Sequence, residues 1–208
     1  MVEVVAETER LRLRDWTDAD ESAFYEVMNT AEVMRWLGGV QTPEEWHAAY
    51  IRIRSYSREF GHTFWIVEDR HSGELQGFCG LKRVNSPGAG KLTGQHEVGW
   101  RLRESAWGKG YAKEAAIACL DLAFDRLGAP HVVALTIGPN AASRGLMMRL
   151  GMTRREDLDF IDIRFGPEMN PSIVYRIDAD EWPAARAVAL VSERAGSSAD
   201  RSLPPGDR

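Results

Sequence analysis

The sequence predicts a mixed α+β fold around one sheet, because strand-like and helix-like segments alternate along the chain. Residues 11–14 (LRLR) alternate apolar and basic side chains with period two, which is typical of a half-buried strand. Residues 115–127 are instead apolar at 116, 119, 120, 123 and 127, the spacing of a helix packed on a core. A strand-like segment at 97–102 leads into a turn with two glycines and then into that helix.

Composition favours a single domain with a proper hydrophobic core, since the chain has 208 residues and 44% hydrophobic content. A net charge of -5 gives no electrostatic reason to expect a nucleic-acid partner. The chain shows no apolar run of the ~20 residues that a membrane span needs, and its start lacks the features of a signal peptide. We therefore expect a cytoplasmic protein with no membrane association.

The two cysteines, Cys79 and Cys119, have no paired spacing suited to a metal and lie in apolar segments. They are interpreted as reduced core thiols, and no metal is expected.

Two helices are predicted between the first strand and the next. Thr17 precedes an acidic turn and apolar positions at helical spacing, so we expect it to cap the first helix. Thr42 and Glu45 form a capping-box pair, and Pro43 stands at the first helical position of the second helix.

The remaining elements follow from the same signals of strand-forming residues, turns and helix ends. In order they are a hairpin of strands 64–68 and 75–81, a loop at 85–90, a strand at 97–102, the long helix, a strand at 131–137, a helix at 140–150 closed by Gly151, and a last strand at 173–177. Beyond residue 181 the chain is alanine-rich with Pro183 near a helix start, which predicts an additional terminal helix. Residues 196–208 have too little apolar surface to fold and are expected to form a flexible tail.

The segment after the strand at 97–102 has the features of a phosphate site. Glycines at 108 and 110 precede a helix, which leaves backbone N–H groups unobstructed at a helix N-terminus, and Lys109 and Lys113 add positive charge. Alone, this pattern is also that of a common structural turn. It is not a P-loop, because no glycine stands five residues before Lys109 and no Ser or Thr follows it. It also lacks the third glycine of a dinucleotide fingerprint.

Several segments together resemble the GNAT acetyltransferase family, and most closely its ribosomal-protein N-terminal acetyltransferase branch. These are residues 97–102 (EVGWRL), 107–115 (WGKGYAKEA), 140–143 (NAAS), 150–152 (LGM) and 8–14 (TERLRLR). The resemblance covers residues 7–178, which leaves 179–195 as a helical extension and 196–208 as the tail. It implies about seven strands in a mixed, mostly antiparallel sheet, with helices on both faces and a splayed central strand pair.

The resemblance also implies a binding site for acetyl-CoA. The strand residues Trp100, Arg101 and Leu102 would pair by their backbone with the pantetheine arm. Asn140 and Ser143 match family positions beside the pantetheine and the thiol, although Asn140 is equally interpreted as a helix N-cap. The loop that would hold the pyrophosphate comprises Trp107, Gly108, Lys109, Gly110, Tyr111 and Ala112.

The sequence departs from the family pattern in two places. The usual Gln or Arg three residues before the first loop glycine is Ser105, and the tyrosine that often protonates the departing thiolate falls on Met147. Since Met147 cannot donate a proton, Ser143 becomes the candidate acid, with an ordinary helix-surface serine as the alternative. Glu97 is the candidate base, directly or through water, because amine acetylation needs a proton acceptor. Its alternative is a solvated surface charge, and His96 is assigned a structural or exposed position.

The expected activity is direct transfer of acetyl from acetyl-CoA to an amine, either a protein N-terminus or a small amine. One alternative is a polyamine or aminoglycoside acetyltransferase, which the net charge of -5 would suit. Another is a CoA-binding module without catalysis, which the methionine at 147 suggests. The acceptor and the oligomeric state, a homodimer among the options, stay open at this level.

Overall fold

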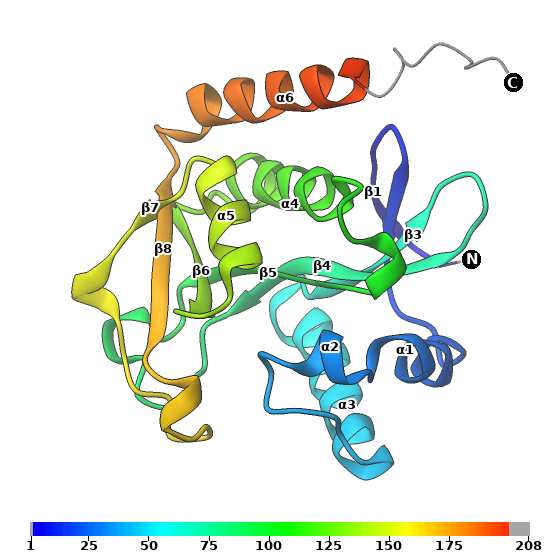
Figure 1. The fold of residues 1–208 in the computed structure, drawn as a ribbon, viewed down its shortest axis with the longest axis vertical. Coiled ribbons are helices and arrows are strands. Elements are labelled where there is room, and N and C mark those ends of the chain that lie inside the picture. The colour runs from blue at the N-terminus through cyan, green and yellow to red at the C-terminus, as the bar shows by residue number, and fades with distance from the viewer. Residues whose placement is uncertain (1, 200–208) are drawn as a thin grey trace, which may run out of the picture.

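The computed structural model describes residues 2–199, which form one eight-stranded sheet in the order β1-β2-β3-β4-β5-β6-β8-β7 (Figure 1). Only the β5–β6 pair is parallel, which confirms a mixed, mostly antiparallel sheet. The strands are β1 (Val4–Glu7), β2 (Leu11–Arg14), β3 (Phe64–Asp69), β4 (Leu75–Arg83), β5 (His96–Leu102), β6 (His131–Ile137), β7 (Thr153–Arg154) and β8 (Ser172–Asp178). The short outermost strands β1 and β7 were not predicted from the sequence.

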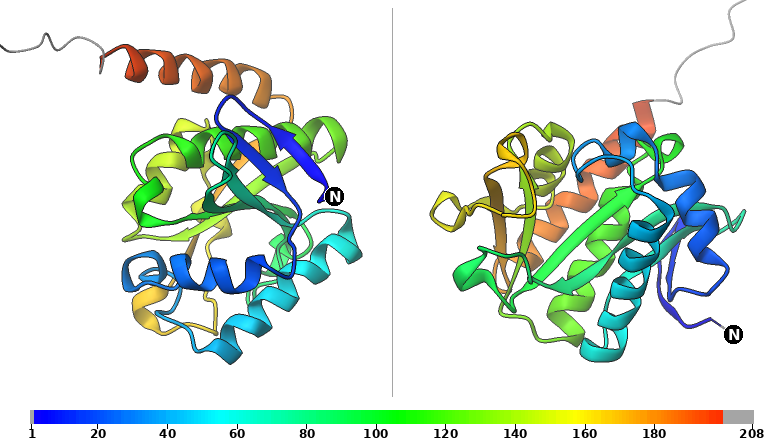
Figure 2. Two further views of the ribbon diagram at one scale, coloured as in Figure 1. Left: turned by 90° about the vertical axis from the view of Figure 1, so that its right-hand side faces the viewer. Right: turned by 90° about the horizontal axis from the view of Figure 1, so that it is seen from below.

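Helices cover both faces of the sheet, as expected (Figures 1 and 2). One face is covered by α1, α2 and α3, the other by α4 and α5, and α6 lies across α4. Their bounds are α1 (Asp20–Met28), α2 (Ala31–Met34), α3 (Pro43–Phe60), α4 (Tyr111–Asp121), α5 (Ala141–Arg149) and α6 (Trp182–Ala199). No helix within residues 2–199 has both the length and the apolar character that crossing a bilayer would require.

The central strands β5 and β6 are splayed. They share a single registered pair, Glu97 with Val133, whereas β4 and β5 are paired along seven positions and so are β6 and β8. Beyond Glu97 the edge of β5 that faces β6 therefore has no strand partner. Unpaired backbone groups at an edge can pair with an extended ligand.

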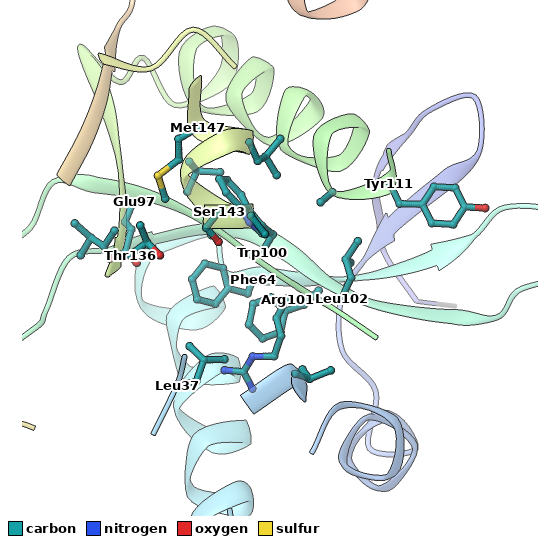
Figure 3. Close-up of a pocket in the computed structure, with 18 of the residues that line it drawn as sticks. Leu37, Phe64, Glu97, Trp100, Arg101, Leu102, Tyr111, Thr136, Ser143 and Met147 are labelled. Atoms are coloured by element: carbon teal, nitrogen blue, oxygen red, sulfur yellow. The ribbon is translucent and has the colours of Figure 1, made fainter. Parts of the chain in front are cut away.

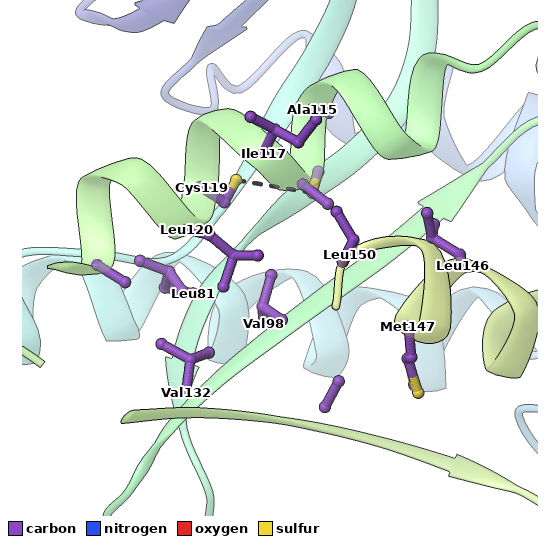
Figure 4. Close-up of a cluster of buried hydrophobic side chains, with 14 of the residues drawn as sticks. Leu81, Val98, Ala115, Ile117, Cys119, Leu120, Val132, Leu146, Met147 and Leu150 are labelled. Atoms are coloured by element: carbon purple, nitrogen blue, oxygen red, sulfur yellow. Dashed lines mark hydrogen bonds between the residues drawn. The ribbon is translucent and has the colours of Figure 1, made fainter. Parts of the chain in front are cut away.

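The main core lies between the sheet and the helices α4 and α5 (Figure 4). Cys79 of β4 and Cys119 of α4 are both free and fully buried in it, with their Sγ atoms 3.6 Å apart. Burial raises the pKa of the Cys119 thiol well above its ordinary value. The prediction of reduced core thiols is confirmed.

A second, largely aromatic cluster attaches the α1–α3 layer to the opposite face. Phe24 of α1 is completely buried, and its ring lies parallel to that of Phe78 in β4 with centroids 5.6 Å apart. Trp16 and Trp46 also pack on the ring of Phe24, with centroid distances of 4.9 and 5.3 Å. This layer forms one wall of the cleft described below.

The helix starts show which local signals were sufficient. Thr42 and Glu45 form the predicted capping box, with Pro43 beginning α3. The predicted capping role of Thr17 is wrong, because α1 begins at Asp20 and Ala19 occupies the cap. The carboxylate of Asp20 accepts hydrogen bonds from the backbone and hydroxyl of Thr17 and pairs with Arg14, which holds this turn outside the helix.

The C-terminal helix runs further than predicted. It spans Trp182–Ala199, so the predicted start of the tail at 196 is wrong for residues 196–199, while residues 200–208 lie outside the described part of the chain. Each residue that extends an existing helix adds a hydrogen bond at little further cost, which a composition argument overlooks. Asp121 of α4 anchors this helix by accepting hydrogen bonds from Trp182 Nε1 at 2.9 Å and Arg186 Nε at 2.8 Å.

A buried histidine makes stability depend on pH. Burial, with the charge of Arg83 as a lesser cause, lowers the pKa of His96 to about 4. An unfolded histidine has a pKa near 6.5, so the unfolded chain binds a proton that the folded chain excludes as the pH falls from about 6.5 to about 4. We expect His96→Gln to lose about 2 kcal/mol less stability than the parent between pH 7.5 and pH 5. Urea unfolding at the two pH values measures this, with the exposed-turn variant His71→Gln as control; equal losses in parent and His96→Gln would contradict it.

Candidate functional site

A cleft of about 2490 Å³ runs along the splay between β5 and β6 (Figure 3). Its walls come from the β5 edge, the loop before α4, the start of α5 and, on the other face of the sheet, α2 and α3. The structure brings every sequence-predicted site residue to this one cleft: Glu97, Trp100, Arg101, Leu102, Trp107, Gly108, Lys109, Gly110, Tyr111, Ala112, Asn140 and Ser143.

The loop before α4 exposes a run of backbone donors. Gly108 and Gly110 adopt left-handed conformations, with φ of 73° and 81°, and Gly110 caps α4 without a side-chain hydrogen bond. Within the described residues, the backbone N–H groups of 108–112 have no protein acceptor. Five successive free donors at a helix N-terminus fit a pyrophosphate.

Arg10, at the β1–β2 turn, braces this loop. Its Nη1 donates to the carbonyl of Lys109 at 2.8 Å, and its guanidinium lies 4.9 Å from the ring centroid of Tyr111. The carboxylate of Glu114 in α4 accepts from Arg10 Nε at 2.7 Å and from the hydroxyl of Thr8. Sequence analysis gave Arg10 and Glu114 no role, although the similarity of residues 8–14 to the family was the signal that could have identified the brace.

One of the two lysines predicted beside the loop lines the cleft but directs its ammonium group to α6. Lys113 is buried, and its Nζ donates to the backbone carbonyl of Ala189 in α6 at 2.9 Å. A lysine one helical turn from the glycines can point to either side of α4, and here the overlying α6 supplies the acceptor. Lys109 stays exposed at the loop.

The residues of β5 alternate between two environments. Val98 and Leu102 are buried in the core beneath α4, with Trp100 packed against it. Arg101 points to the opposite face, where its guanidinium lies 5.1 Å from the ring centroid of Phe78. The backbone of Arg101 lies on the β5 edge that faces β6. Its side chain extends to the other face of the sheet, toward α2 and α3.

Glu97 is a buried charge, which excludes the alternative of a solvated surface residue. Its side chain pairs with Lys82 Nζ at 2.6 Å, and the whole residue is 8% exposed. It lies beside Thr136 at one end of the cleft (Figure 3). The neighbouring His96 is buried rather than exposed, at 6%, so of its two predicted positions the structural one is found.

The start of α5 carries the other predicted polar groups. Asn140 Oδ1 accepts from the backbone N–H of Ser143 at 3.2 Å, which confirms its capping role. Ser143 is half-buried and lies above the middle of the cleft near Trp100 (Figure 3). Met147 follows one turn later, is 2% exposed and belongs to the core. The serine hydroxyl is therefore a polar group that α5 presents to the cleft one turn before this methionine.

The end of the cleft on the α2–α3 face was not marked by any motif. We call it the acceptor end and define it by Trp36, Arg52, Phe64, Arg101 and Phe165, all of which line the cleft. Its five residues come from five separate segments, so no local pattern could have shown that they meet.

Comparisons with known proteins identify the family of this chain. The model of the "Acetyltransferase (GNAT) domain" family matches residues 10–153. YkkB, an uncharacterized protein of Bacillus subtilis (strain 168), is 30% identical over 146 residues, which are 70% of this chain and 83% of the relative. A second protein of that organism, the uncharacterized N-acetyltransferase YnaD, is 29% identical over 178 residues, covering 84% of this chain and 97% of the relative.

Solved structures show the same architecture. An acetyltransferase from Agrobacterium tumefaciens str. C58 superposes with a TM-score of 0.68 at 28% identity, covering 83% of this chain and 92% of that one. The RimL ribosomal L7/L12 α-N-protein acetyltransferase superposes equally well at 15% identity over 86% and 95%, which is a likeness of fold alone. Given the matched family model, the splayed sheet and the loop, the chain belongs to the GNAT acetyltransferase family and is an acetyl-transfer enzyme.

Proposed function

We propose that this protein is an acetyl-CoA-dependent N-acetyltransferase that moves acetyl directly to an amine. The observation that carries the proposal is the continuity of the unpaired β5 edge with the five free N–H groups of the loop, inside one cleft. Members of the family use acetyl-CoA as co-substrate. A curated relative, the FsC-acetyl coenzyme A-N(2)-transacetylase of Aspergillus fumigatus, is 41% identical over 64 residues, or 31% of this chain and 27% of that protein.

The residues present fit that co-substrate. The loop donors would hold the pyrophosphate, with Arg10 keeping the loop carbonyl of Lys109 turned away from it. The free edge of β5 would take the pantetheine arm in the way that a sheet edge takes an added strand. When bound, the thioester supplies an activated acetyl group.

Two side chains would move the protons. Glu97 accepts the proton that the amine must lose as its nitrogen–carbon bond forms, directly or through water. Ser143 donates a proton to the sulfur as the carbon–sulfur bond breaks, and solvent returns a proton to its hydroxyl oxygen. Neither cysteine lines the cleft, and their thiols are buried against each other, so neither can reach the thioester as a nucleophile. This supports direct transfer over a covalent protein intermediate.

Release of free thiol from acetyl-CoA, followed with a colorimetric thiol reagent, tests the proposal. The amine panel contains short peptides, amino acids, polyamines and aminoglycosides. We expect turnover with at least one amine and an N-acetylated product by mass spectrometry. Tight CoA binding without turnover on any amine would instead identify a non-catalytic CoA-binding module.

A substitution in the loop tests where CoA binds. Gly108 has a φ of 73°, and a Cβ there would meet no atom within 4 Å, so a valine brings backbone strain without a clash. We expect Gly108→Val to weaken CoA binding about tenfold or more by isothermal titration calorimetry, because the relaxed loop would turn its N–H groups away. Gly61→Val is the matched control, with a φ of 71°, equally open space and a place outside the cleft. Parent-like CoA affinity in Gly108→Val would show that the pyrophosphate lies elsewhere.

A further inference from the structure

The acceptor end contains an arginine whose charge the protein does not balance. Among the described residues, the Nε of Arg101 is fully buried without a hydrogen-bond partner, and Nη1 hydrogen-bonds to the Sδ of Met34 at 3.5 Å. The guanidinium also lies against the uncharged ring of Phe78. No carboxylate lies within ion-pair distance of Arg101 among the described residues. Burial, followed by the charge of Arg52, lowers the pKa of Arg101 to about 10. A desolvated guanidinium without an acceptor is destabilising and persists where a ligand completes it.

The second arginine at this end, Arg52, also has no carboxylate partner within the described residues, although it is exposed rather than buried. Arg52 of α3 lines the cleft, is exposed, and forms no ion pair within the described part of the chain. Both guanidinium groups therefore face the cleft as uncompensated positive charges. Their mutual repulsion would be relieved by one anion bound between or beside them.

The carboxylates that line this part of the cleft are already paired with basic side chains other than Arg101 and Arg52. Each has a basic partner nearby: Glu97 pairs with Lys82 at 2.6 Å, Asp162 with Arg164 at 2.5 Å, and Glu32 with Arg35 at 3.7 Å. The local excess charge is thus positive, opposite to the net charge of the whole chain. A polycationic acceptor would meet two arginines here rather than an acidic pocket.

The arrangement along β5 also sets a span. Glu97 and Arg101 are four residues apart on the same face, so their Cα atoms are separated by about 13 Å at the usual strand rise. The amine must reach the Glu97 end while the anion reaches the guanidinium, whose side chain points away from Ser143 toward Leu37 (Figure 3). An acceptor with its two groups several bonds apart would fit. Phe64 and Trp36 would pack on the chain between them.

We propose that the acceptor carries an anionic group, a carboxylate or phosphate ester several bonds from the amine, which Arg101 binds with help from Arg52. A single guanidinium group, such as that of Arg101, can offer two parallel N–H donors to such a group. The inference rests on the proposed function and specifies its substrate class. It disfavours the polyamine and aminoglycoside alternatives, whose cationic substrates the two arginines would repel.

Matched acceptor pairs test this. The probes are ω-amino carboxylates with three to six carbons against their primary amides, and aminoalkyl phosphates against the corresponding amino alcohols. We expect one anionic series to exceed its neutral partners about ten- to a hundredfold in kcat/KM. The series that is preferred distinguishes a carboxylate from a phosphate. Equal kcat/KM for charged and neutral partners would overturn the inference while leaving the proposed function intact.

Variants tie the preference to the two arginines. Arg101→Met should bring the acid-to-amide ratio close to one, and Arg52→Met, at an exposed position that the fold does not need, should lower it in part. Arg58→Met, on the same helix as Arg52 but outside the cleft, should keep the parent ratio. A ratio unchanged in both Arg101→Met and Arg52→Met would overturn the assignment.

Direct binding separates the two failures. Calorimetry in the presence of CoA, with the same acids and amides, should show tighter binding of the acids. If no amine is acetylated, the proposed function fails, and this comparison still decides the inference: acids binding more tightly support it, and equal or undetectable binding of both overturns it.

Discussion

Replacing Glu97 with glutamine is expected to lower kcat by about 10²–10⁴, with little change in the KM for acetyl-CoA. Glutamine keeps the size of the side chain and removes the negative charge that lies 2.6 Å from Lys82 Nζ in the parent, and it cannot take a proton from the amine. Steady-state rates at saturating acetyl-CoA, measured across pH, check this.

Two comparisons make the result interpretable. Glu104→Gln alters an exposed glutamate outside the cleft and should keep the parent kcat. Thermal unfolding and CoA affinity of Glu97→Gln should stay close to the parent values. A variant with parent-like kcat would leave Glu97 as the structural partner of Lys82 and would place the base elsewhere.

Phe24→Ala is expected to cost about 3–5 kcal/mol of the free energy of unfolding. The side chain is completely buried and contacts Trp16, Trp46 and Phe78, so its removal leaves a cavity at the junction of the α1–α3 layer with the sheet. Urea unfolding measures the loss. Val188→Ala, at a residue that is 71% exposed, should change stability by no more than about 0.5 kcal/mol. A loss below about 1 kcal/mol in Phe24→Ala would mean that the cluster does not hold this layer.

The sequence was most informative where the signal is local. The capping box of Thr42 and Glu45 and the N-cap of Asn140 depend on residues three apart, and both formed as predicted. Thr17 failed as a cap because a longer-range ion pair, Arg14 with Asp20, competes for the same turn. The outer strand β1 has the sequence VVAE, which does not alternate apolar and polar side chains as the equally short β2 does, and β7 has only two residues.

The site was predictable where short motifs of the family marked it, at 97–102, 107–112 and 140–143. The loop and the β5 edge were named correctly as parts of one cleft, because their residues adjoin in sequence. Arg10 and Glu114 are 104 residues apart, so their brace requires the fold to be known. The orientation of Lys113 likewise depends on α6, and the charge of the acceptor end depends on which carboxylates already have partners.

The single registered pair between β5 and β6 divides the sheet into two mechanical units, β1–β5 and β6–β8. A co-substrate lying along the free edge of β5 would occupy the gap between these units. Its hydrogen bonds to β5 would replace the backbone pairing that β6 does not supply. Loading would then stiffen the molecule as a whole. Amide protons in β5 and β6 near this gap should exchange with solvent more slowly once CoA is bound. This slowing requires no change in the secondary structure of either strand.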